Sequence, residues 1–109
     1  MIYELRIYEA APGKMGDLNR RFRDLTLGLF AKHGMKAEWF ATPLVGDWSD
    51  RLYYLMSYED MADREQKWAS FQADPDWQKG RAESEQNGPL VARLTNSFLR
   101  PTAYSPGQR

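Results

Sequence analysis

Residues 2–9 alternate between two kinds of side chain, which predicts a β-strand with two unlike faces. One face is apolar and suits a protein core. The other carries opposite charges and a phenol, and it suits water, a partner subunit or a ligand cleft. The two faces are Tyr3, Leu5 and Ile7 on the one side, and Glu4, Arg6 and Tyr8 on the other.

The next stretch, residues 14–33, has apolar positions spaced alternately three and four apart, which predicts a helix with one continuous core-facing stripe. Gly34 follows and is expected to end the helix in the left-handed conformation. Arg20, Arg21 and Arg23 fall outside the stripe, and we expect them on a solvated face. The stripe consists of Met15, Leu18, Phe22, Leu25 and Leu29.

The rest of the chain predicts a hairpin, two further helices and a last strand. Asp60 is expected to cap the second helix, and Asp74-Pro75 is expected to start the third. Glycine and proline mark the turns between these elements. The predicted spans are strands at 35–45 and 51–58 with a turn at 46–50, helices from Asp60 and from Asp74 to Glu85, and a strand at 93–99.

This order of elements predicts one α+β domain over residues 1–109 with a ferredoxin-like βαββαβ fold. Right-handed crossovers place both helical segments on one face of a four-stranded antiparallel sheet. We expect the uncovered face to be mixed polar and aromatic, and a second copy of the subunit to cover it. The side chains expected on that face are Glu4, Arg6, Tyr8, Tyr54, Met56 and Tyr58.

Composition excludes several classes of function. Basic and acidic residues are balanced at 15 each, so nothing steers the chain towards nucleic acid or an anionic membrane. With no cysteine and one histidine, we expect no disulfide, no cysteine nucleophile and no metal site. No apolar run could span a membrane, and Met1 leads directly into the first strand, so we expect a soluble cytoplasmic protein. Phosphate-loop and dinucleotide motifs are missing, and we expect no cofactor.

Several motifs, taken together over the whole chain, resemble the NIPSNAP family. They are M-I-Y-E-L-R-I-Y at 1–8 with P-G-K at 12–14, K-H-G at 32–34, Y-E-D-M-A-D-R-E at 58–65, A-D-P-D-W at 73–77 and L-R-P-T-A-Y-S-P at 99–106. The resemblance implies a dimeric α/β barrel in which two ferredoxin-like sheets pair face to face. That wider group includes cofactor-free monooxygenases, haem-degrading enzymes and isomerases, with sites between sheet and helices. Small bacterial NIPSNAP members have no established reaction, and relatives carry His-x-Trp where this chain has Tyr54-x-Met56.

Two groups of residues could carry chemistry. His33 lies at the predicted end of a helix, where it suits the helix dipole; the alternatives are a general base or an axial haem ligand. Glu4, Arg6 and Tyr8 lie on one face of a strand and suit a salt-bridge network that fixes a dimer. The sharper alternative is that Arg6 receives a carboxylate or enolate while Tyr8 or Tyr54 donates to an oxygen.

The leading hypothesis from the sequence is a homodimeric binding module for a small hydrophobic or carboxylate-bearing ligand. The first alternative is a cofactor-independent monooxygenase or isomerase, with His33 or Glu4 as proton acceptor. The second alternative is a structural or scaffolding dimer, for which Trp48 in the hairpin turn would be a contact. The residues expected to line the ligand site are Arg6, Tyr8, Trp39, Tyr54 and Tyr58.

Overall fold

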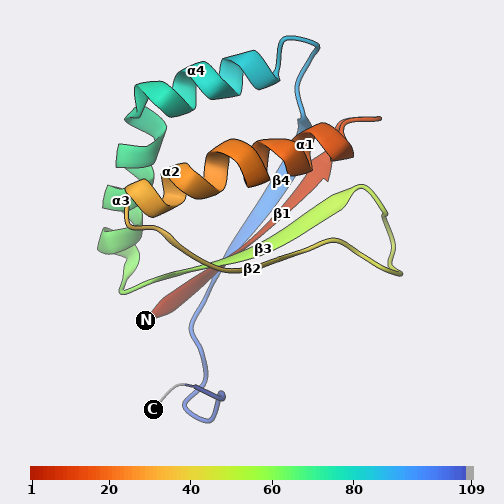
Figure 1. The fold of residues 1–109 in the computed structure, drawn as a ribbon. Coiled ribbons are helices and arrows are strands. Elements are labelled where there is room, and N and C mark those ends of the chain that lie inside the picture. The colour runs from red at the N-terminus through yellow and green to blue at the C-terminus, as the bar shows by residue number, and fades with distance from the viewer. Residues whose placement is uncertain (108–109) are drawn as a thin grey trace.

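The computed structural model describes residues 1–107 and contains a four-stranded antiparallel sheet with its helices on one face (Figure 1). The strand order is β2-β3-β1-β4, so the ferredoxin-like prediction is confirmed. The elements are β1 (Ile2–Ala10), α1 (Met15–Arg21), η1 (Phe22–Thr26), α2 (Leu27–Lys32), β2 (Lys36–Ala41), β3 (Arg51–Tyr58), α3 (Met61–Ala73), α4 (Pro75–Ser84) and β4 (Val91–Leu99).

The central strand β1 shows which side chains share a face of the sheet. Arg6 pairs with Tyr54 on β3 and with Asn96 on β4, and side chains of directly paired residues point the same way. The predicted grouping of Glu4, Arg6 and Tyr8 with Tyr54, Met56 and Tyr58 on one face is therefore confirmed.

The predicted position of that face is wrong, because it lies under the helices. Glu4 is fully buried, and Arg6 and Tyr8 are only 6% and 8% exposed. Trp68 of α3 lies over the Arg6 guanidinium, and Phe22 of η1 packs against the Tyr8 ring. A charged face can be buried in this way because its charges pair with one another and with the helices.

The opposite face of the sheet is covered by no helix (Figure 1). Trp39 and Leu99 on this face are 45% and 46% exposed. The alternate residues of β1 and β3 also point to this side and are partly buried. They are Tyr3, Leu5, Ile7, Tyr53 and Leu55.

The first helical segment is interrupted by the π-helical turn η1. The backbone N–H of Leu27 donates to the carbonyl oxygen of Phe22, five residues earlier. In a regular α-helix, Arg21 and Thr26 would lie about 140° apart around the axis. The wider turn brings both onto the buried face, while Leu25 is only partly buried. The prediction of a solvated face is confirmed for Arg20 and Arg23 and wrong for Arg21.

The second helical segment consists of α3 and α4. Asp60 caps α3 by accepting from the Asp63 N–H, and Asp74 caps α4 by accepting from the Asp76 N–H, as predicted. α4 packs against α1 and η1 on the helix-covered face of the sheet (Figure 1). Gly80 permits this approach, because a Cβ atom there would lie 2.5 Å from Cδ2 of Leu25.

Two smaller predictions concern the turns. Gly34 has a φ of 68°, so the expected left-handed helix end is confirmed. Strand β2 ends at Ala41, four residues earlier than predicted, and residues 42–50 form an exposed connection. Trp48 in this connection is 52% exposed and lies beside the Arg51 guanidinium.

No helix among residues 1–107 is long and apolar enough to cross a membrane.

Candidate functional site

The Arg6 guanidinium organises a buried polar network on β1 and β3. Its Nε donates to the Tyr54 hydroxyl at 2.7 Å, and its Nη1 donates to the Glu4 carboxylate at 2.8 Å. Its Nη2 donates to the Tyr8 hydroxyl at 3.1 Å. Alternate residues on β1 point the same way, which is why residues 4, 6 and 8 meet here. All three guanidinium nitrogens are therefore used, and the group is held in one orientation.

The Glu4 carboxylate has donors on both oxygens. Arg64 of α3 donates to Oε1 at 3.1 Å and to Oε2 at 3.0 Å, and Asn96 of β4 donates to Oε2 at 2.9 Å. Burial alone would raise the pKa of Glu4, but the bonds from Arg64 and Asn96 and the charge of Arg6 hold it below its usual value. An ionised carboxylate with this many donors is a poor proton acceptor.

The Tyr54 and Tyr8 hydroxyls form one hydrogen bond to each other, at 2.8 Å. Arg6 has no acceptor atom, so within this group each hydroxyl can donate only to the other hydroxyl. Their single mutual bond uses one of the two hydroxyl protons. One hydroxyl proton therefore remains for an acceptor outside the network. Tyr54 donates in the bond between the two hydroxyls, and burial raises the pKa of Tyr54 well above its ordinary value, so Tyr54 keeps this proton.

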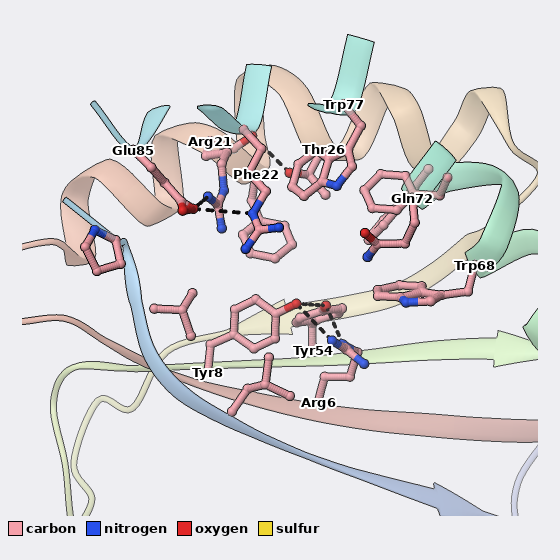
Figure 2. A pocket seen from close by; sticks show the side chains of 16 residues that line it. Arg6, Tyr8, Arg21, Phe22, Thr26, Tyr54, Trp68, Gln72, Trp77 and Glu85 are labelled. Carbon is pink, nitrogen blue, oxygen red and sulfur yellow. Dashed lines mark hydrogen bonds and ion pairs between the residues drawn. The ribbon is translucent and has the colours of Figure 1, made fainter. Parts of the chain in front are cut away.

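A cavity of about 190 Å³ lies between this network and the helices. Figure 2 shows Tyr8, Tyr54 and Arg6 on the sheet side, facing Arg21, Phe22 and Thr26 across it. We call it the sheet–helix cavity. Its walls are mostly aromatic and arginine side chains. It is lined by Arg6, Tyr8, Arg21, Phe22, Thr26, Phe30, Tyr54, Trp68, Phe71, Gln72, Trp77, Arg81, Glu85, Pro89, Val91 and Leu94.

Arg21 is a lining residue that the sequence reasoning placed on the surface. Its Nη1 donates to the Ser84 hydroxyl at 3.3 Å and to the Glu85 carboxylate at 3.2 Å, and its guanidinium lies 5.5 Å from the centre of the Trp77 ring. The sequence reads as a run of surface arginines, and only the π-helical turn places Arg21 inside. No signal in the sequence marks that turn.

The predicted ligand-site residues separate into three groups. Arg6, Tyr8 and Tyr54 line the sheet–helix cavity together. Tyr58 is buried on the same face but does not line it, and its hydroxyl has no hydrogen-bond partner among the residues described. Trp39 lies on the opposite, uncovered face, beside a separate hollow bounded by Leu55 and Leu99.

His33 is also outside the cavity. It follows the last residue of α2, and its Nε2 lies 2.7 Å from Oδ2 of Asp74. Bonds from Lys32 and His33 hold the pKa of Asp74 well below its usual range, so this carboxylate accepts and Nε2 carries the proton. His33 thus lies at the end of α2, as predicted, and its ring bonds the residue that caps α4. Within residues 1–107, no group of histidine, aspartate and glutamate side chains could hold a metal ion.

A family model described as NIPSNAP matches residues 3–106 of the chain. The chain belongs to the NIPSNAP family. The resemblance seen in the sequence motifs is thereby confirmed over nearly the whole length. Comparison with curated proteins finds no match.

Solved structures agree with the NIPSNAP assignment. An uncharacterized NIPSNAP-like domain protein from Burkholderia xenovorans is 27% identical, with a TM-score of 0.84 over 96% of this chain and 88% of that one. An uncharacterized NIPSNAP domain protein from the same organism is 24% identical, with a TM-score of 0.84 over 97% of this chain and 99% of that one. A putative antibiotic biosynthesis monooxygenase from Nitrosomonas europaea shares the fold at 9% identity, with a TM-score of 0.63 over 93% and 98% of the two chains.

Proposed function

We propose that this NIPSNAP-family protein is a homodimeric binding module whose small-molecule ligand occupies the sheet–helix cavity. The observation that carries the proposal is the uncommitted hydroxyl proton of the Tyr8–Tyr54 pair at the cavity. A buried donor without an acceptor is costly, and a ligand oxygen would satisfy it. The aromatic rings of Phe22, Trp68 and Trp77 supply apolar walls for the rest of the ligand.

The network is also held rigidly, as ligand recognition requires. Arg6 is fixed by three bonds, and Trp68 lies over it with the guanidinium carbon 4.5 Å from the ring centre. The Tyr54 ring stacks on the Phe40 ring with the two ring centres 5.0 Å apart, which fixes the position of the Tyr54 hydroxyl. A donor that is already oriented binds its ligand without losing further side-chain freedom.

Binding without turnover is the function that the site supports best. A monooxygenase or isomerase of the kind suggested by the fold neighbour needs a proton acceptor at its substrate. The two acceptors predicted from the sequence, Glu4 and His33, do not line the cavity. The hydroxyl donors and Arg6 can bind an oxygen atom but do not readily accept a proton. The carboxylate that lines the cavity, Glu85, is already paired with two arginines.

Calorimetric titration with phenol tests the binding proposal, because phenol is a neutral single ring of a size that suits the cavity. We expect saturable binding with one phenol per chain. Leu94 is 45% exposed and lines the cavity, so Leu94→Trp should block entry and abolish binding. Leu44→Trp is the control, because Leu44 is 99% exposed on the connection after β2. Equal binding by both variants would place the site elsewhere.

The homodimer is proposed to form through the uncovered sheet face. Trp39, Leu55 and Leu99 surround an open hollow there, and a second copy of the same face would bury them. Light scattering of the wild type should give twice the mass of one chain. Trp39→Lys should give a monomer, whereas Trp48→Lys should leave the dimer intact. The opposite result would favour the scaffolding hypothesis, in which Trp48 is the contact.

A further inference from the structure

The helix side of the sheet–helix cavity carries more positive than negative charge. Arg21 Nη1 lies 3.2 Å from Oε2 of Glu85, and Arg81 Nε lies 3.4 Å from the same oxygen. Two guanidinium groups therefore share one carboxylate, which leaves one positive charge in excess. On the sheet side, the charges of Arg6 and Arg64 are matched by those of Glu4 and Glu65. An anion in the cavity would be attracted to the helix side.

Arg21 is the better placed of the two arginines to hold that anion. Its side chain is only 6% exposed, whereas that of Arg81 is 56% exposed to water. Both hydrogen bonds of Arg21 leave from Nη1, and its Nε has no partner among the residues described. A guanidinium can offer two parallel N–H groups to a carboxylate, so Arg21 has unused capacity of the kind that carboxylates bind.

The volume of the cavity limits the size of the ligand. An apolar protein cavity of about 150 Å³ holds one benzene molecule. The sheet–helix cavity, at about 190 Å³, has room for one ring and a small substituent. Its walls include Phe22 and Trp77, whose faces suit a flat ring.

We propose that the sheet–helix cavity binds a single-ring aromatic carboxylate, with the carboxylate held by Arg21. This inference rests on the proposed function, because it names the ligand class of the same cavity. It assigns a binding role to the last residue of α1, next to the π-helical turn. It also requires a preference for negative charge that a merely apolar cavity would not show.

Calorimetric titration with three ligands of similar shape separates charge from size. The probes are benzoate, benzamide and benzamidinium, which carry negative, zero and positive charge. We expect benzoate to bind at least about tenfold more tightly than benzamide, the factor typical of one charge-assisted hydrogen bond. Benzamidinium should bind more weakly than either.

Arg21→Gln and Arg20→Gln form a matched pair of variants on one helix. The Arg20 side chain is 62% exposed and pairs with Asp17, so its loss should leave the benzoate preference unchanged. Arg21→Gln should bring the affinity for benzoate down to that for benzamide. Benzamide binding itself serves as the check that the cavity is intact, and Arg21→Lys should restore part of the preference.

Three other outcomes would contradict one or both proposals. If the wild type binds benzamide as tightly as benzoate, the anion proposal is wrong and the binding function stands. If Arg21→Gln keeps the preference while its benzamide binding is normal, the assignment to Arg21 is wrong. If neither phenol nor any of the three probes binds, both proposals are wrong.

Discussion

The hydroxyl groups of Tyr54 and Tyr8 lie 2.8 Å apart although the residues are 46 positions apart in the chain. Their strands are paired so that Tyr8 lies opposite Leu52 and Arg6 lies opposite Tyr54. The two phenols therefore meet diagonally across β1 and β3, and Arg6 donates to both. The position of the uncommitted hydroxyl proton follows from strand register, so changes to either residue should affect both stability and binding.

Tyr54→Phe should destabilise the fold. The change removes the acceptor of Arg6 Nε and leaves a buried donor without a partner, which costs about 1–3 kcal/mol. The free energy of unfolding, measured by urea denaturation, should fall by that amount. Tyr53→Phe is the control, because Tyr53 lies on the uncovered face and is only partly buried. An equal loss in both variants would contradict the role given to the network.

Glu4→Gln should be more costly than Tyr54→Phe. Glu4 is fully buried and is the shared acceptor of Arg6 and Arg64, so its loss leaves two cations facing a neutral amide. Removing one partner of a buried ion pair costs about 3–5 kcal/mol. Glu65→Gln is the matched control, since Glu65 binds the same Arg64 but is 65% exposed. We expect the control to change the free energy of unfolding by less than about 1 kcal/mol.

The contribution of Glu4 should also depend on pH. Its pKa is lower in the folded protein than its ordinary value of 4.5, so the folded state binds fewer protons in this range. The stabilisation is complete above pH 4.5 and is lost as the pH falls through the folded-state pKa. Urea denaturation in steps from neutral to acidic pH should show the wild type and Glu4→Gln converging below that value. A constant difference at all pH values would contradict this assignment.

The fold could be predicted from the sequence because alternation and helical spacing report which residues share a face. They do not report which face is covered. The charged face of β1 looks exposed because the partners that allow its burial are distant in the chain: Arg64 is 60 positions and Asn96 is 92 positions from Glu4. Pairing over such separations cannot be read from local patterns.

The candidate site was predictable only on its sheet side. Arg6, Tyr8 and Tyr54 were identified because strand alternation brings them together. Arg21 was missed because the π-helical turn changes the period within the helix and moves one arginine from the surface to the interior. Trp39 was predicted for the ligand site but lies on the uncovered face, where it pairs with Leu55. This pairing depends on a register shift in β2, which could not be predicted from the sequence.

Tyr54 and Tyr58 should resist ionisation in the folded protein. Burial raises the pKa of both Tyr54 and Tyr58 above the ordinary value of 10.0. At about pH 11 the folded protein should therefore keep these two phenols neutral, and unfolding in urea should add their phenolate absorbance. The increase on unfolding should be smaller by one phenolate in Tyr54→Phe.

The same shift has a consequence for stability at alkaline pH. Above pH 10 the folded state binds more protons than the unfolded chain, so the free energy of unfolding should fall as the pH rises. Tyr104→Phe is the control, because Tyr104 is 87% exposed. If unfolding at about pH 11 releases no additional phenolate absorbance, the burial of Tyr54 and Tyr58 is contradicted.

His33→Gln distinguishes a structural histidine from a catalytic or ligand-binding one. The His33 ring is bonded to Asp74 at 2.7 Å and packs edge-on against Phe71, which connects the end of α2 to the junction of α3 and α4. Loss of this hydrogen bond should lower the free energy of unfolding by about 0.5–1.5 kcal/mol. Because His33 does not line the sheet–helix cavity, the affinity for phenol and the benzoate preference should match those of the wild type. A variant of normal stability with weakened binding would move the ligand site to the end of α2.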